Sequence, residues 1–324
     1  MQKKFQTPKT FSENTPKDLK SSDAAPRAFS LIELSIVILI IGIIISGITS
    51  ATRLVYQFRI NSARSLTSSS AVNSIAGLLI WFETTSEKSF ADSEESDGVQ
   101  VTTWYDINPH NQFKYSLVQN ISSNKPTYIA KGQSAGLPVL QSFSTPSSVQ
   151  RMSTSANLDL TNNPSFTIFV VASASNGGGS QSQIFSIGDI SGACTQFSLN
   201  YWGSNTGNLQ FNGGDKTFDM NSSNMLALFR IVRYGDDAGS STVNGSTTKF
   251  NFNGSSKSVD SRTGSDCVPA LASAPFSLTK TVPASSTTLT VQFGEIIIFN
   301  RVLKPDEITD IEAYLSKKWS IKLI

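Results

Sequence analysis

FSLIELSIVILIIGIIISGI, residues 29–48, decides the architecture of this 324-residue chain. The stretch is an almost unbroken apolar run of about twenty residues, the length that a helix needs to cross a lipid bilayer. Its one charged residue is Glu33, and an ionised carboxylate costs roughly 2.5–3.5 kcal/mol at the bilayer centre. Glu33 lies near one end of the run, where reaching the interface relieves part of that cost. The run predicts a membrane-spanning helix in which Glu33 is either a tolerated polar residue or a functional one.

The residues around this carboxylate carry a more specific signal. Ala28-Phe29-Ser30-Leu31-Ile32-Glu33-Leu34, behind a basic leader and ahead of an Ile/Val-rich run, resembles the processing site of type IV pilins and pseudopilins. The resemblance implies that a membrane-bound prepilin peptidase cuts between Ala28 and Phe29, and that the new amino terminus is methylated. It also implies that Glu33 pairs with the terminal amine of a neighbouring subunit, since a buried carboxylate is best tolerated when a cation neutralises it.

The same resemblance implies partners and a location. The partners are the prepilin peptidase, other pilin or pseudopilin subunits and the bacterial inner membrane. The chain beyond the helix is expected in the periplasm or, after assembly, on the cell surface. Three features depart from the family's pattern: Ala28 stands where Gly is usual, Ser50 stands where many members carry a helix-bending Pro, and the leader, residues 1–28, is long.

Charge separates the leader from the rest of the chain. Residues 1–28 hold six basic and three acidic residues, a net charge of +3, whereas the whole chain holds 26 basic and 24 acidic residues. The remainder therefore carries a net charge of −1. A near-neutral mature chain lacks the basic surface of a nucleic-acid-binding protein. The positive leader favours a cytoplasmic amino terminus.

A stem is expected after the apolar run, within a helical region over residues 29–77. Leu54 and Phe58 lie four residues apart, and the apolar positions between Ile75 and Phe82 also follow helical spacing. The Ser-rich run 65–70 between them consists of weak helix formers. It is compatible with a frayed hinge inside one long helix.

From residue 78 onward the pattern becomes that of a β domain. Short apolar or alternating runs are separated by clusters of Gly, Asn, Ser and Pro, which is typical of an all-β sandwich or barrel. The clearest predicted strands are 164–172 and 229–234, and Asn244-Gly245 predicts a hairpin turn. Residues 78–324 are thus expected to form a β head.

The C-terminal segment adds a second resemblance. A strand over 293–299 precedes a helix over 305–319, which starts with Pro and acidic residues and ends with Lys317 and Lys318, as the helix dipole favours. These segments look like the closing part of concanavalin A-like (laminin-G-like) jelly rolls, and Leu79–Phe82 with Val101–Asn108 is similar to that family's first strands. The resemblance implies a two-sheet antiparallel sandwich with a short C-terminal helix. Lectins, glycanases and adhesive modules share that fold, so it does not give the function.

Candidate catalytic groups are few. The glycanase members of that family carry Glu-x-Asp-x-x-Glu on a strand, which supplies two carboxylates to flank a sugar bond, and the pattern does not occur here. The acidic group 92–97 is expected to be a solvated loop. The sole histidine, His110, excludes multi-histidine metal sites and leaves weak options for a nucleophilic triad. From these observations we expect that the protein is not an enzyme.

Candidate binding residues carry weaker signals. Trp104, Tyr201 and Trp202 have rings that can stack on a sugar, although core packing accounts for such residues more often. Laminin-G-like sandwiches often hold a calcium ion at one rim, and the loop carboxylates suited to it are Asp189, Asp215, Asp236 and Asp237. No spacing selects among these carboxylates, and no other cofactor is expected.

Two cysteines, Cys194 and Cys267, lie in the part of the chain that is expected to be exported. An exported pair favours a disulfide, and the alternative is two separate buried thiols. Their spacing is not that of a metal site.

Together these features favour a pilin-like or pseudopilin subunit that assembles through its N-terminal helix into a pilus or a type II secretion pseudopilus. Its lectin-like head would serve adhesion or recognition of a glycan or another cell-surface ligand. The alternative is a bitopic, membrane-anchored carbohydrate-binding protein that is not assembled.

Overall fold

A computed structural model describes most of the chain: residues 30–132, 135–144, 149–159, 165–176, 182–188, 196–202, 206–211, 214–219, 225–234, 248–257, 273–281 and 289–324. The chain divides into two compact units, Met1–Arg53 and Leu54–Ile324. Helix α1 (Leu31–Ser68) begins in the first unit and ends in the second. The predicted hairpin at Asn244-Gly245 lies outside the described residues.

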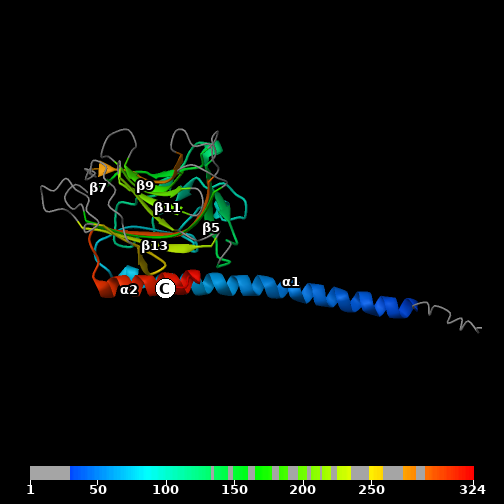
Figure 1. Ribbon diagram of the computed structural model, residues 1–324. Helices are drawn as coiled ribbons and strands as arrows, with labels where there is room; N and C mark the ends of the chain where they lie inside the picture. The colour runs from blue at the N-terminus through cyan, green and yellow to red at the C-terminus, as the bar shows by residue number, and fades with distance from the viewer. Residues whose placement is uncertain are drawn as a thin grey trace, which may run out of the picture. The chain divides into compact units, whose positions relative to one another are not determined.

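Two antiparallel sheets, each of eight strands within the described residues, form the larger unit (Figure 1). The first sheet has the spatial order β15 (Ser255–Lys257), β14 (Thr248–Phe252), β13 (Ala227–Arg233), β8 (Phe166–Asn176), β18 (Leu289–Phe299), β5 (Val139–Ser144) and β4 (Thr127–Ile129), and β1 (Leu78–Glu83) also pairs with β18. The second sheet has the order β12 (Gly214–Asp219), β11 (Thr206–Phe211), β10 (Gln196–Trp202), β9 (Ser182–Gly188), β17 (Phe276–Thr281), β6 (Met152–Thr154), β3 (Leu117–Val118) and β2 (Thr103–Trp104).

Short elements complete the unit. Strands β16 (Ser273–Ala274) and β7 (Leu158–Asp159) pair with each other, and 3-10 turns occupy η1 (Ala71–Asn73), η2 (Asp92–Glu94) and η3 (Ser122–Asn124).

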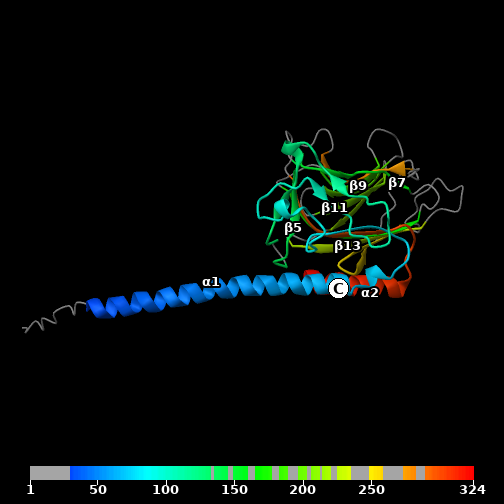
Figure 2. The same cartoon turned by 180° about the vertical axis from the view of Figure 1, so that it is seen from behind.

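The central strands of the first sheet are buried on both faces. In β8, Ile168 and Val170 point into the core between the sheets, whereas Phe169 and Val171 belong to a second apolar cluster on the other face. This alternation follows from the two-residue period of a strand. Figures 1 and 2 show α2 along this second face, the one turned away from the other sheet.

Helix α2 (Pro305–Trp319) covers the second face with Ile311, Leu315 and Trp319. Its first turn is held by Glu307, whose Oε2 accepts a hydrogen bond of 2.8 Å from the backbone N–H of Lys304. The helix has the bounds that the sequence predicted. A long apolar helix, a two-sheet antiparallel sandwich and a short C-terminal helix confirm the predicted fold class.

Two sequence predictions meet in this region: the helical spacing from Ile75 to Phe82, and the resemblance of Leu79–Phe82 to a first strand of the sandwich. Strand β1 confirms the second prediction, and the first is wrong. The helical spacing of the apolar residues from Ile75 to Phe82 is not followed by a helix, because β1 begins at Leu78 and pairs with β18 along its length. All six residues of β1 are buried. A strand buried on both faces lacks the alternation that distinguishes a strand from a helix, so periodicity could not identify it.

The Ser-rich run 65–70 ends α1. The helix stops at Ser68, and the Asn73 side chain donates to the carbonyls of Thr67 (3.0 Å) and Ser68 (3.1 Å). These are carbonyls that a helix end leaves without an intrahelical partner. The run is therefore a capped terminus and not a hinge inside a longer helix.

Candidate functional site

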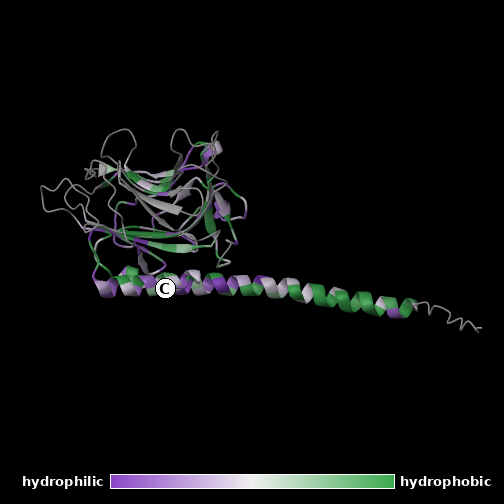
Figure 3. Cartoon of the chain, in the orientation of Figure 1, coloured by the Kyte–Doolittle hydropathy of each residue, from purple (hydrophilic) through white to green (hydrophobic). Residues whose placement is uncertain are grey.

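The N-terminal part of α1 presents apolar side chains to its surroundings. Every residue from Ser30 to Val55 is exposed, and the most apolar 18-residue window of the helix has a mean hydropathy of 2.8 (Figure 3). Within the described residues this is the one helix long and apolar enough to cross a membrane. An apolar surface of this size is stable when lipid or other protein surrounds it.

Glu33 caps the start of this helix. Its Oε2 accepts a hydrogen bond of 2.9 Å from the backbone N–H of Ser30, and the Ser30 hydroxyl accepts a long one of 3.4 Å from the N–H of Ile32. Ser30 and Glu33 thus resemble the two members of a capping box. The carboxylate that the pilin resemblance assigns to assembly also satisfies a backbone donor of its own helix.

The C-terminal part of α1, residues 54–68, is called the stem here. Its buried residues are Ile60, Ala63 and Thr67, which lie on one helical face. Leu54 and Phe58, which lie four residues apart as helical spacing requires, are 58% and 65% exposed. These two apolar side chains therefore do not belong to the face that packs on the head.

Polar contacts hold the stem along its length. The Tyr56 hydroxyl donates to the carbonyl of Ala130 at 2.9 Å. Arg64 donates through Nε to the carbonyl of Thr85 at 2.8 Å, and its Nη1 lies 2.6 Å from Oε1 of Glu87. The Glu87 side chain is 76% exposed, so this ion pair adds little to stability, as is usual for surface pairs.

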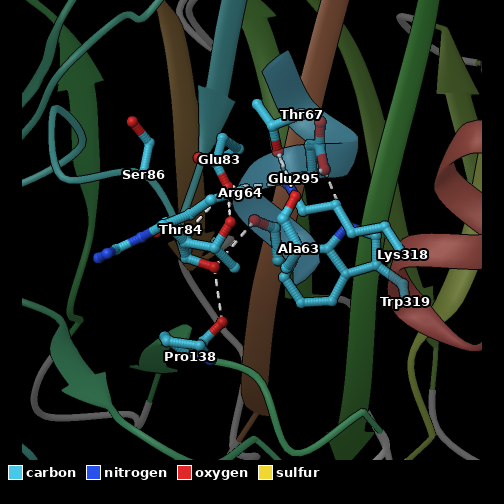
Figure 4. Close-up of polar contacts among 12 residues, drawn as sticks. Ala63, Arg64, Thr67, Glu83, Thr84, Ser86, Pro138, Glu295, Lys318 and Trp319 are labelled. Carbon is cyan, nitrogen blue, oxygen red and sulfur yellow. Dashed lines mark hydrogen bonds and ion pairs between the residues drawn. The ribbon is translucent and has the colours of Figure 1, made fainter. Parts of the chain in front are cut away.

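The end of the stem reaches a buried charge cluster, formed by Thr67, Glu83, Glu295, Tyr314 and Lys318. The ammonium of Lys318 has an exposed fraction of 0% and lies 2.8 Å from Oε2 of Glu83 and 2.9 Å from Oε2 of Glu295. It also donates to the Thr67 hydroxyl at 2.7 Å (Figure 4). One cation thereby joins α1, β1, β18 and α2.

Glu295 is the most completely bonded member of the cluster. Its Oε1 accepts from the indole of Trp81 at 2.8 Å and from the Tyr314 hydroxyl at 2.7 Å. Its Oε2 accepts from the indole of Trp319 at 2.8 Å in addition to contacting Lys318. Four donors on one carboxylate satisfy the requirement that a buried charge be paired and hydrogen-bonded.

Burial and the two neighbouring carboxylates shift the pKa of Lys318 in opposite directions. Burial disfavours the ammonium and lowers its pKa, whereas Glu295 and Glu83 raise it, and the net result is a pKa above the usual lysine value. Burial also raises the pKa of Tyr314 well above its ordinary value, and Glu295 and Glu83 raise it further. At neutral pH the cluster therefore contains a charged ammonium beside a neutral phenol.

Several residues predicted from the sequence lie outside the described residues. These are the processing pair Ala28 and Phe29, the cysteines Cys194 and Cys267, and the carboxylates Asp189, Asp236 and Asp237. Asp215 belongs to strand β12. In the part of the chain that the structure describes, no three His, Cys, Asp or Glu residues gather as a metal site would require.

The aromatic candidates for sugar stacking lie apart in the second sheet. Trp104 has an exposed fraction of 0%, packs against Phe82 and Phe90, and donates through Nε1 to the carbonyl of Glu83 at 3.0 Å. Its ring is enclosed by the core and presents no face to a ligand. Tyr201 and Trp202 are the last residues of β10.

His110 is exposed in a loop, with Nε2 at 2.5 Å from the carbonyl of Asn73.

Sequence reasoning missed the buried charge cluster. The sequence analysis explains Lys317 and Lys318 by their favourable interaction with the helix dipole, and it predicts no role for Glu83 or Glu295. The available signal was a lone carboxylate inside each of two apolar strands, Leu78–Glu83 and Leu289–Phe299. A carboxylate in such a strand needs a buried cation or several donors.

Comparisons with known proteins identify no family. No family model matches the sequence, and no curated protein matches it. Among solved structures, the chain is similar to a Trypanosoma rangeli sialidase, with 12% identity and a TM-score of 0.41 over 75% of this chain and 33% of the sialidase. It is also similar to the botulinum neurotoxin serotype C1 binding domain, with 10% identity and a TM-score of 0.45 over 75% of this chain and 53% of that one. The chain spans less than two thirds of each, and the likeness concerns the fold alone.

The sequence-based prediction that the protein is not an enzyme is wrong as an exclusion, because sialidases are among the solved structures that resemble this chain. The prediction rested on a missing pattern of clustered carboxylates. A missing carboxylate pattern excludes one mechanism and leaves enzymes as a class open.

Replacing the buried cation tests the role of the cluster. Lys318→Met should lower the free energy of unfolding of the head by about 3–5 kcal/mol, because two buried carboxylates lose their cation. Unfolding of the detergent-solubilised protein can be followed by the fluorescence of Trp81 and Trp319, which both contact Glu295. The matched control is Lys317→Met at the neighbouring exposed position, which should change stability by less than about 0.5 kcal/mol. Equal effects of the two variants would contradict a special role for Lys318.

The raised pKa of Lys318 predicts how this stabilisation depends on pH. The folded state binds the lysine proton more tightly than the unfolded state, whose lysine pKa is about 10.4. The difference in unfolding free energy between the wild type and Lys318→Met should stay constant from neutral pH to about pH 10 and shrink as pH rises further. Denaturant unfolding of both proteins from pH 7 upward measures this difference. A decline that is already complete below pH 9 would show that the pKa of Lys318 is lowered instead.

Proposed function

We propose that the protein is a pilin-like or pseudopilin subunit that is anchored in the bacterial inner membrane and assembles through the apolar part of α1. The observation that supports this most is the exposed apolar surface from Leu31 to Ile48, which carries one carboxylate, Glu33, near its start. A helix buried in a soluble core would be covered, and a plain anchor has no need of an acidic residue. The β head would be displayed in the periplasm or on the cell surface.

Processing completes the proposal. A prepilin peptidase would cut between Ala28 and Phe29, so that the mature chain starts four residues before Glu33. The amine of the mature terminus would then be available to a carboxylate on a neighbouring subunit. The pairing would offset the cost of a charge within the apolar environment of the assembled helices.

The head is proposed to recognise a glycan or another cell-surface ligand. Two features support this role: the sandwich is far larger than an anchor requires, and sandwiches of this architecture serve as scaffolds for many binding sites. The second candidate function is that of a membrane-anchored protein that carries the same binding head and is not assembled. The apolar surface of the helix suits both arrangements, and the carboxylate of Glu33 within it favours assembly.

Two substitutions separate the roles of Glu33. Glu33→Val should leave membrane insertion intact but reduce incorporation into filaments or pseudopili about tenfold or more, because the neighbour's amine loses its counter-charge. Glu33→Gln is the matched control, because it removes the charge and keeps an acceptor for the backbone N–H of Ser30. Incorporation can be quantified in the sheared surface fraction relative to the membrane fraction.

The outcomes distinguish three accounts. Loss with both Glu33→Val and Glu33→Gln would support pairing between subunits through the charge of Glu33. Loss with Glu33→Val and normal incorporation with Glu33→Gln would assign Glu33 to capping its own helix. Normal incorporation of Glu33→Val would contradict the assembly role, and absence of the wild-type protein from filaments would favour the unassembled anchor.

A further inference from the structure

A pocket opens between the end of the stem, strand β1 and the loop that follows β2. Its volume is 460 Å³, and its lining includes Arg64, Asn73, Trp81, Glu83, Lys88 and Ile107. All of these residues belong to the unit Leu54–Ile324. The volume falls within the range of small-molecule sites, and a wall that mixes apolar side chains with a few polar groups is usual for them.

The deepest polar group of the lining is an incompletely bonded carboxylate. Glu83 has an exposed fraction of 0%, and its Oε2 accepts from the backbone N–H of Thr85 (2.7 Å), from the Thr85 hydroxyl (2.7 Å) and from Lys318 (2.8 Å). Its Oε1 is buried and has no hydrogen-bond partner in the part of the chain that the structure describes. Because a buried acceptor without a donor is costly, this oxygen favours a small donor such as a hydroxyl group.

The rim of the pocket favours an anion. Arg64 and Lys88 bring two positive charges, and Glu87, which pairs with Arg64 at 2.6 Å, offsets one of them. Lys88 is exposed, and its ammonium makes no hydrogen bond or ion pair within the described residues. Figure 4 shows Arg64, Glu83 and Ser86, which all line the pocket. A carboxylate at the rim would bring Lys88 into a charge-assisted contact and give Arg64 a second one beside its pair with Glu87.

The wall opposite the stem is fixed in place. Asp106 Oδ1 accepts from the backbone N–H groups of Trp81 and Asn108, each at 3.0 Å. Asn108 in turn donates from its side chain to the carbonyl of Leu78 at 2.9 Å. These bonds hold the loop that carries Ile107 against β1. A wall organised in advance lowers the entropic cost of binding.

We propose that this pocket binds an acidic monosaccharide of the uronic acid class, either free or at the end of a glycan. A sugar hydroxyl would donate toward the floor at Glu83, the carboxylate would contact Lys88 and Arg64, and the ring would lie against Ile107. The inference rests on the glycan-recognition part of the proposed function and names its ligand class and site. Because Arg64 belongs to the stem and Lys88 to the head, the ligand would also join these two parts of the unit.

Calorimetric titration of the detergent-solubilised full-length protein tests this site. The probes are sodium glucuronate, glucose and sodium phosphate, because glucose lacks the carboxylate and phosphate lacks the sugar ring. Glucuronate should bind about tenfold more tightly than glucose, as one charge-assisted contact provides. Lys88→Gln should weaken glucuronate binding about tenfold, and Lys322→Gln, at another exposed lysine outside the pocket, should not change it.

Three results would overturn the proposal. They are equal affinity for glucuronate and glucose, phosphate binding as tight as glucuronate binding, and equal effects of Lys88→Gln and Lys322→Gln. Normal incorporation of the wild-type protein into filaments, measured separately, would leave the assembly role intact in each case. Failure of the site and failure of the assembly role are thus distinguishable.

Discussion

The contact of Lys318 with Glu83 and Glu295 is the interaction on which the larger unit depends. It brings together one strand at the start of the head, one strand near its end, the C-terminal helix and, through Thr67, the stem. Removing these charges from water costs several kcal/mol per ion, so the cluster is better explained by the unique placement it imposes than by its net stability. Apolar packing of Ile60 and Ala63 alone would allow the stem to slide or rotate, because such contacts lack direction. A buried cation with fixed partners allows only one position of the stem against the head.

This constraint separates the role of the head from the role of the N-terminal part of α1. The sandwich has two apolar layers, one between its sheets and one under its helices, and the stem and α2 close the outer layer. The remaining length of α1 carries apolar residues that no described part of the chain covers. The head thus completes its own core without the N-terminal part of α1, which leaves that part free to interact with lipid or with other subunits. The proposed pocket lies where the stem meets the first strand, beside the same cluster.

The sequence predicted those parts of the molecule that local patterns determine. The bounds of α2 followed from Pro305 and the acidic residues after it, and the core of β8 followed from its aromatic and β-branched residues. The apolar residues of β1 show helical spacing and do not alternate with polar ones, because both faces of the strand are buried. The resemblance of Leu79–Phe82 to a first strand therefore predicts this element, and periodicity does not.

The candidate site was harder to predict. A lysine in the last turn of a helix suits the dipole whether it is solvated or buried, and only the tertiary structure shows that Lys318 is buried and Lys317 is exposed. The carboxylates that pair with it lie 212 residues apart in the sequence, at 83 and 295. Conversely, the residues around Glu33 are local in sequence. The cap with Ser30 was not predicted, although its Ser-x-x-Glu pattern is typical of helix starts.

The intact mass and the N-terminal sequence of the protein purified from its native membrane test the central claim most directly. The account predicts a chain that starts at Phe29 and carries one additional methyl group. A chain that retains Met1 and the residues up to Ala28 would contradict prepilin-type processing. The apolar helix would then be an anchor for the β head and not an element of assembly.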